Sequence, residues 1–243
     1  MNRSRLAFLT LALSFILTAL ACAAPTFGPT EPAASPTPLG DTLAFNIPTY
    51  AISLQPGDTV PGTRLHYVGR EGDAFKVTID GLEATKRVGD SFIWSGTLAP
   101  GVYANYNLRL AFTVLGSLPA AGSVEVIVFN PEPMEAEIAT SITEAQAYFD
   151  KILVSYEIPV GRLIPGSTLV YKGLVEPETG QQTSALAELA GMSGYPFFAL
   201  GDSLVWTGKL RNNVYIRYNL RITAVNETNL SVAGTAELWI TAE

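Results

Sequence analysis

The sequence predicts an all-β protein, with two tandem antiparallel β-sandwich domains behind a signal peptide and a Pro-rich tether. The chain has 243 residues, of which 48% are hydrophobic and 15% charged, with 21 Gly and 16 Pro. This composition suits strands and turns better than helices. Apolar and polar residues alternate over long runs, and two segments match each other in the same order. A duplicated β domain is therefore expected.

The first segment, residues 1–21, has the pattern of a secretory signal peptide. Arg3 and Arg5 form a positive start, residues 6–20 are free of charge and mostly apolar, and small residues precede Cys22. The apolar stretch is too short to favour a membrane-spanning helix.

The end of this leader, Ala19-Leu20-Ala21-Cys22, resembles the lipobox of bacterial lipoproteins. The resemblance implies that the leader is cut before Cys22 and that acyl chains such as palmitate are attached to this residue. Such a protein is anchored outside the cytoplasm on the cell membrane, since two or three chains bind a bilayer firmly. Cys22 is also the only cysteine, so no disulfide forms within one molecule. The alternative is an ordinary signal peptide with an incidental cysteine.

Residues 22–42 are rich in Pro, Ala and Thr, which predicts an extended, semi-rigid tether. Loss of Arg3 and Arg5 with the leader leaves 13 basic and 22 acidic residues, a net charge of −9. This charge argues against nucleic acid, or an anionic bilayer surface, as a partner. The expected partners are the membrane, through the lipid, and a protein or glycan.

The duplication is visible in two pairs of segments. Val60–Gly69 matches Ile164–Gly173 at an offset of 104, and Val88–Leu110 matches Leu200–Ile222 at an offset of 112. The second copy therefore carries eight extra residues, and Ser184–Met192 is expected to add a short helical turn there.

The matching segments place two sandwich domains on the chain. The first repeat is expected at 43–130 and the second at 148–243, each long enough for one small sandwich. The segment between them, 131–147, is acidic and lacks strong strand periodicity, so it is expected to be a linker.

Each repeat contains a strand with a strict period of two, which indicates one buried face and one polar face. The buried faces are expected to comprise Tyr106, Leu108, Leu110, Phe112 and Val114 in the first repeat, and Ile216, Tyr218, Leu220, Ile222 and Ala224 in the second. The polar faces comprise Tyr103, Asn105, Asn107, Arg109 and Thr113, and Tyr215, Arg217, Asn219, Arg221 and Thr223. Turn signals such as Pro100-Gly101 and Asn212-Asn213 separate the runs.

The first repeat contains the motif "WSGTLAPG", which precedes the alternating strand, and the motif "DTVPGTRLHYVG" upstream. Both motifs resemble immunoglobulin-like repeats of unknown function in bacterial surface proteins. The second repeat departs from the first motif, with "KLRNN" in place of "TLAPG". The resemblance implies an immunoglobulin-like sandwich and a surface location, and it implies no reaction.

The tetrapeptide Gly201-Asp202-Ser203-Leu204 resembles the nucleophile motif of a family of lipases and esterases. That family requires an α/β/α domain and a histidine base downstream of the serine. The only histidine, His66, precedes Ser203, and the first repeat carries "GDSF" at the equivalent place. The expectation is a protein that is not an enzyme, in which Asp90 and Asp202 bond their own turns.

The tryptophans that follow, Trp94 and Trp206, share their faces with Phe92 and Leu204. A core position is therefore favoured over an exposed platform for sugar stacking. With Asp90, Asp202 and the inward tyrosines Tyr106 and Tyr218, they form the predicted structural motif of the repeat.

A candidate binding face lies on the polar sides of the alternating strands. Its residues are Tyr103, Asn107, Arg109, Tyr215, Asn219 and Arg221. One interpretation is structural, with ion pairs Arg109–Asp90 and Arg221–Asp202, which would contribute about 0–1 kcal/mol each. The other is recognition of a glycan or protein, because Tyr and Arg are frequent in binding hot spots.

No cofactor or metal is expected, and a weak Ca²⁺ site among Asp73, Asp80, Glu83 and Asp90 is kept as a minor alternative. The leading functional hypothesis is a non-enzymatic, membrane-anchored lipoprotein that acts as a surface spacer, adhesion or assembly module. The alternative is a lipoprotein that binds a glycan or another envelope component on the Tyr/Asn/Arg face.

Overall fold

The computed structural model describes residues 41–112, 116–138, 145–175 and 186–242. These residues form strands and turns without a helix, which confirms the all-β prediction. No helix in this part of the chain is therefore long and apolar enough to cross a bilayer. The predicted signal peptide, Cys22 and nearly all of the tether lie outside the described residues.

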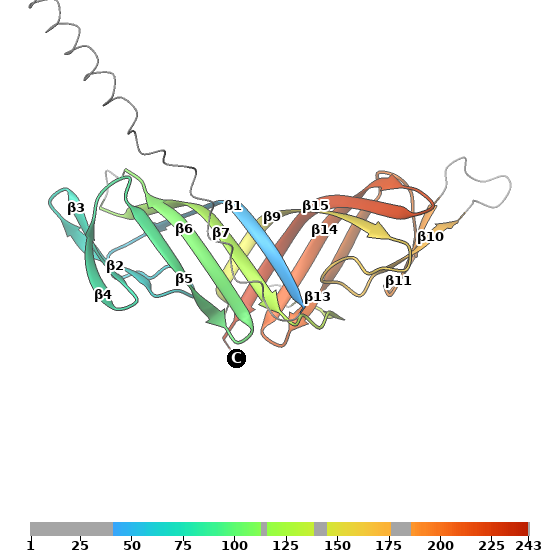
Figure 1. The fold of residues 1–243 in the computed structure, drawn as a ribbon, viewed down its shortest axis with the longest axis horizontal. Helices are drawn as coiled ribbons and strands as arrows, with labels where there is room; N and C mark the ends of the chain where they lie inside the picture. The colour runs from blue at the N-terminus through green and yellow to red at the C-terminus, as the bar shows by residue number, and fades with distance from the viewer. Residues whose placement is uncertain (1–40, 113–115, 139–144, 176–185, 243) are drawn as a thin grey trace, which may run out of the picture. The chain divides into compact units, whose positions relative to one another are not determined.

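The first repeat contributes an antiparallel sheet with strand order β1-β7-β6-β5 (Figure 1). Its strands are β1 (Thr42–Leu54), β5 (Ser91–Ala99), β6 (Val102–Leu110) and β7 (Leu118–Phe129). The inward residues of β6 are fully buried, among them Tyr106 and Leu108 at 0% exposure. Alternation in the sequence thus becomes one core face and one outer face.

The second repeat contributes an antiparallel sheet of order β8-β13-β14-β15-β9 (Figure 1). Its strands are β8 (Met134–Glu135), β9 (Ala145–Pro159), β13 (Ser203–Arg211), β14 (Val214–Val225) and β15 (Asn229–Thr241). Tyr218 and Ile216 on β14 are fully buried, as their counterparts on β6 are. This five-stranded sheet positions the candidate site.

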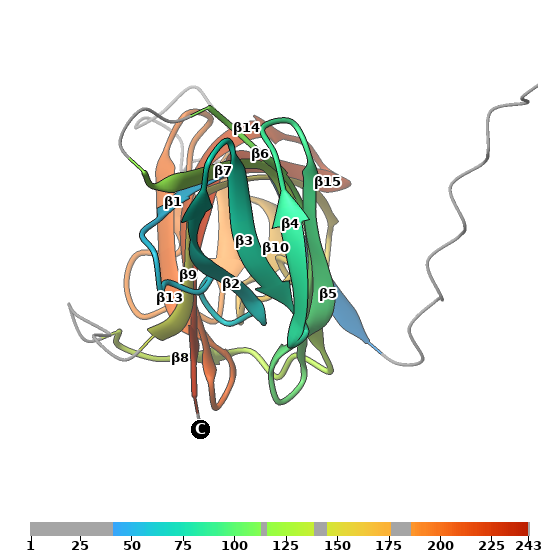
Figure 2. The same cartoon turned by 90° about the vertical axis from the view of Figure 1, so that its left-hand side faces the viewer.

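Each repeat also contains a small three-stranded antiparallel sheet, and Figure 2 shows that of the first repeat in front. It comprises β2 (Leu65–Glu71), β3 (Ala74–Ile79) and β4 (Leu82–Lys86). Its counterpart comprises β10 (Val170–Val175), β11 (Leu186–Ala190) and β12 (Phe197–Phe198).

Two details of the predicted layout are wrong. Leu186–Ala190 forms strand β11, paired on both sides, where a helical turn was expected within Ser184–Met192. Phe112 is 73% exposed, since β6 ends at Leu110. The predicted linker, 131–147, contains β8 and the first residues of β9, because β13 and β15 offer open edges for pairing, and its bounds stay a prediction. Thr113 and Val114 lie outside the described residues.

The Pro-Gly loops of the two repeats are held by the same hydrogen bonds. Tyr106 Oη donates to the Pro61 carbonyl over 3.3 Å, and Tyr218 Oη donates to the Pro165 carbonyl over 2.9 Å. Desolvation by burial raises the pKa of both phenols well above 10. Both tyrosines therefore remain neutral donors, which explains why both repeats keep a tyrosine at this inward position.

The described residues between 41 and 242 belong to one compact unit, and their buried side chains make a single connected core. Contacts between the repeats contribute to it: the Phe149 ring lies 6.0 Å from that of Tyr50 and 6.4 Å from that of Tyr106. The boundaries at 43–130 and 148–243 therefore stay a prediction from the sequence repeat, and the immunoglobulin-like topology stays an implication of the resemblance.

Candidate functional site

The Gly-Asp-Ser segments form turns that lead into β5 and β13. Asp90 Oδ2 accepts a hydrogen bond from the Arg87 amide at 2.8 Å, and Asp202 Oδ2 accepts one from the Ala199 amide at 2.7 Å. Ser203, the first residue of β13, is exposed. The aspartate thus closes the turn in each repeat, and the serine begins the strand.

The only histidine of the chain lies in a different sheet from Ser203. His66 stands on β2, where its Nδ1 lies 3.2 Å from Thr59 Oγ1. Its hydrogen-bond partner is thus a threonine of its own repeat. A serine nucleophile requires a base within hydrogen-bond reach, and the described residues place no histidine near Ser203.

Trp94 and Trp206 occupy core positions, with exposures of 4% and 3%. Each indole lies over the glycine two residues further along its strand: a Cβ built on Gly96 would lie 2.6 Å from the Trp94 ring, and Gly208 faces Trp206 in the same way. The indole nitrogens donate to Asp80 and Thr168 over 3.1 Å. The Trp-x-Gly motif therefore packs a large ring against a bare backbone.

The predicted ion pairs between Arg and Asp are absent. Arg109 Nη1 donates to the Gly89 carbonyl over 3.2 Å, because the Asp90 carboxylate already accepts from its own turn. In the second repeat, Asp202 is engaged in the same way, and no ion pair joins it to Arg221 within the described residues. The structural interpretation of these two arginines as ion-pair partners is therefore wrong.

The acids considered for a weak Ca²⁺ site do not converge. Asp80 pairs with Arg64 at 2.8 Å, and Asp73 pairs with Arg87 at 3.4 Å. In the part of the chain that the structure describes, no three His, Cys, Asp or Glu side chains could hold one metal ion.

The candidate binding face divides between two sheets. Tyr103, Asn107 and Arg109 lie on the outer face of β6, where Asn107 and Arg109 are exposed and Tyr103 is half-buried. The cross-strand row through Tyr103 contains only one aromatic ring. It comprises Thr97, Tyr103, Ile127 and Ala44.

The equivalent row of the second repeat is aromatic across three neighbouring strands. Tyr215 on β14 pairs with Trp239 on β15, which pairs with Tyr148 on β9. Lys209 on β13 extends the row beyond Tyr215. We call Tyr215, Trp239 and Tyr148 the aromatic row. It lies on the outer face because its neighbours along each strand are core residues.

Two cations lie over rings of the aromatic row. Arg217 Cζ lies 5.6 Å from the Trp239 ring centroid, and Lys209 Nζ lies 5.0 Å from that of Tyr215. The Tyr148 and Trp239 centroids are 5.3 Å apart at an interplanar angle of 31°. Cation–π contacts of this kind contribute about 0.5–1 kcal/mol at exposed sites, so they restrict the motion of both rings.

The polar groups beside the aromatic row converge on Glu237. Tyr148 Oη donates to Glu237 Oε2 over 3.2 Å, and Asn219 Nδ2 donates to Oε1 over 3.4 Å. Burial, followed by the charge of Glu237 and the hydrogen bond to it, raises the pKa of Tyr148 to about 12. Tyr148 thus remains a hydrogen-bond donor at any physiological pH.

Of the predicted face in the second repeat, Tyr215 belongs to the aromatic row and Asn219 is hydrogen-bonded to Glu237 beside it, whereas Arg221 stands two residues beyond Asn219. Two residues of the row, Tyr148 and Trp239, were not singled out from the sequence. Trp239 could have been noticed as the only tryptophan without a counterpart, since Ile127 stands at the equivalent place. Tyr148 carries no such signal, because it enters the row only through the pairing of β9 with β15.

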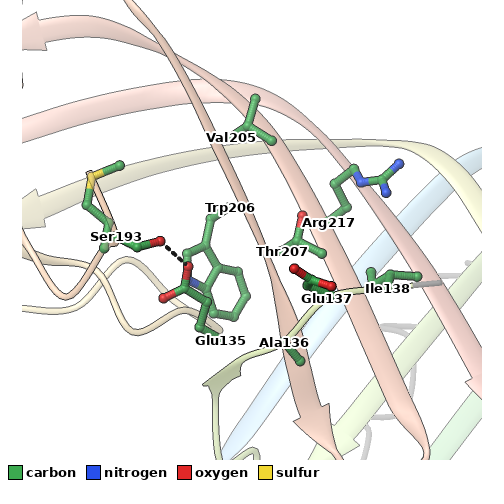
Figure 3. A pocket seen from close by; sticks show the side chains of 10 residues that line it. Glu135, Ala136, Glu137, Ile138, Ser193, Val205, Trp206, Thr207 and Arg217 are labelled. Carbon is green, nitrogen blue, oxygen red and sulfur yellow. Dashed lines mark hydrogen bonds between the residues drawn. The ribbon is translucent and has the colours of Figure 1, made fainter. Parts of the chain in front are cut away.

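A groove of about 670 Å³ runs along β13 beside this face (Figure 3). It is lined by Glu135, Glu137, Met192, Val205, Thr207 and Arg217, among others. Ser193 Oγ donates to Glu135 Oε1 over 3.0 Å at one end. Arg217 lines the groove and also lies over the Trp239 ring of the aromatic row. Its guanidinium donates no hydrogen bond to any described side chain or carbonyl.

No protein-family model matches the chain, and neither the curated proteins nor the solved structures include a match to it. The functional argument therefore depends on the residues and their geometry.

Proposed function

We propose that the protein is a non-enzymatic extracytoplasmic lipoprotein, anchored through Cys22, which acts at the cell surface as a spacer, adhesion or assembly module. The observation that carries this proposal is the single connected core that the described residues of both repeats form. Two repeats that share one core form a stiff body on a Pro-rich tether. Such a body suits a spacer or an adhesion module, because it holds a binding surface in a fixed geometry.

The order of segments supports the anchor. The leader ends at the lipobox-like Ala19-Leu20-Ala21-Cys22, and about twenty residues separate Cys22 from the first strand at Thr42. A segment of that length spans at most about 70 Å. The β body would therefore remain close to the membrane that carries its lipid.

The anchor is tested with the full chain and its Cys22→Ser variant in a bacterial host. We expect the unchanged chain to incorporate labelled palmitate and to sediment with membranes, and the variant to lose both properties. A soluble, unlabelled chain, or a variant that is still labelled, would contradict lipidation at Cys22. A signal-sequence variant that blocks export serves as the control for processing.

A second candidate function is the binding of a glycan or another envelope component. The aromatic row favours it, because three rings on one outer sheet face stand beside an amide, a carboxylate and a guanidinium. Apolar ring faces with a few converging polar groups are typical of ligand sites. The sequence-based hypothesis placed the binding face in both repeats, whereas this candidate places it on the outer face of the second repeat only.

A further inference from the structure

We infer that the aromatic row binds an extended, uncharged β-1,4-linked hexopyranose chain, which lies across β14, β15 and β9 with Arg217, Glu237 and Asn219 beside it. This inference deepens the second candidate function and rests on it. It names the ligand class and the residues that would contact the ligand.

The geometry of the row supports a straight ligand. Tyr215, Trp239 and Tyr148 occupy consecutive cross-strand positions, and neighbouring strands lie about 4.8 Å apart. The three rings therefore form a straight line of roughly 10 Å across the strands. A β-1,4-linked chain of hexopyranoses is likewise straight, and its sugars present flat C–H faces. An α-linked chain curves, so its sugars would not follow a straight row of rings.

The row is ordered before any ligand binds. Arg217 lies over Trp239, Lys209 lies over Tyr215, and Tyr148 is held by its hydrogen bond to Glu237. Fixing a side chain on binding costs about 0.5–1.5 kcal/mol for each flexible group. Rings that are already held avoid part of this cost, and a sugar chain would contact the parts of the rings that Arg217 and Lys209 leave uncovered.

Polar groups next to the aromatic row can form hydrogen bonds with sugar hydroxyls. Glu237 offers acceptors besides those used by Tyr148 and Asn219, and Asn219 offers the rest of its amide. Arg217, which pairs with Glu237 across the strands, donates no hydrogen bond to any described residue. Sugar hydroxyls both donate and accept, so a mixed set of this kind suits them. The net charge of −9 without the leader would repel a polyanionic glycan, which is why an uncharged chain is proposed.

The first repeat provides a matched comparison within the same molecule. Its equivalent positions hold Thr97, Tyr103, Ile127 and Ala44, with one ring in place of three. Residues such as Ile127 are enough for a purely structural role in the outer row, since Ile127 pairs across its sheet as Trp239 does. The rings of the second repeat are thus additional to what the sheet requires.

The test is calorimetric titration of the full chain in detergent with cellohexaose, chitohexaose and, as the curved comparator, maltohexaose. We expect binding of at least one β-linked hexamer and no binding of maltohexaose. Trp239→Ala and Tyr148→Ala should each weaken binding by at least tenfold, and Trp239→Phe should retain part of it. Tyr103→Ala, at the matched position of the first repeat, should leave the affinity unchanged.

Two outcomes would overturn the inference: no binding of either β-linked hexamer at millimolar concentration, or equal affinity of the unchanged chain and Trp239→Ala. Thermal unfolding of each variant separates loss of binding from loss of folding. Failure here leaves palmitate incorporation and membrane association unaffected, so failure of the ligand proposal is distinguishable from failure of the anchor proposal.

Discussion

At the scale of single residues, the Trp-x-Gly motif shows how side-chain size is matched within one strand. Gly96 and Gly208 face the core two residues after a tryptophan, and the indole occupies the space that a Cβ would need. The strand keeps its period of two while the large ring lies flat along it. The glycine is thus retained for space, since its backbone is an ordinary strand.

Gly96→Ala should destabilise the protein by about 1–3 kcal/mol, because the new methyl group would force the Trp94 ring from its position. Chemical denaturation followed by tryptophan fluorescence measures this change. Thr97→Ser, on the exposed face next to it, should stay within about 0.5 kcal/mol. Equal stability of Gly96→Ala and the unchanged chain would show that the indole is not confined by this contact.

At the scale of strands and turns, the tips of two hairpins hold the repeats together. Arg211 Nη1 donates to the carbonyls of Phe129, at 2.7 Å, and Asn130, at 3.2 Å. The side chain amide of Asn213 donates to the Pro100 carbonyl over 3.3 Å. The second repeat carries "KLRNN" where the first has "TLAPG", and this difference supplies Arg211 and Asn213 for contact with the first repeat.

Arg211→Ala should lower the free energy of unfolding by about 1–3 kcal/mol, because two charge-assisted hydrogen bonds between the repeats are lost. Arg221→Ala, an exposed arginine of the same sheet, should change it by less than about 0.5 kcal/mol. Urea unfolding of both variants gives the comparison. If the two variants are equally stable, Arg211 does not fasten the hairpin tips.

The sequence allows prediction of strands but not of their partners. Strict alternation locates β6 and β14, and Gly-Asp turns locate the starts of β5 and β13, because these signals are local. Pairing of β9 with β15 is not local, since the paired residues are 70 to 96 positions apart along the chain, from Asn229 with Pro159 to Thr241 with Ala145. The aromatic row depends on that register, so Tyr148 could not be assigned to the site from the sequence.

At the scale of the whole molecule, buried tyrosines make stability sensitive to alkaline pH. Desolvation raises the pKa of Tyr50 to about 12, and it raises those of Tyr106 and Tyr218 as well. The unfolded chain ionises near pH 10, whereas the folded protein keeps these phenols neutral. Stability is therefore fully present below pH 10 and is lost as the pH rises from there toward 12.

Between pH 10 and 12, the free energy of unfolding should fall by about 1.4 kcal/mol per pH unit for each tyrosine that stays neutral in the folded protein. Denaturant titrations at a series of pH values measure this slope. Tyr50→Phe removes one such group and should make the slope shallower. A free energy of unfolding that does not change up to pH 12 would show that the tyrosines have the same pKa in the folded and unfolded states.

The glycan-binding proposal claims that the protein binds its ligand through the outer face of the five-stranded sheet. Its most direct test is hydroxyl-radical footprinting of the full chain, by mass spectrometry, with and without a saturating β-linked hexamer. We predict that oxidation of Tyr148, Tyr215 and Trp239 decreases on binding, whereas Tyr195, which is 69% exposed elsewhere, is unchanged. Unchanged oxidation of all three rings in the bound state would contradict the claim.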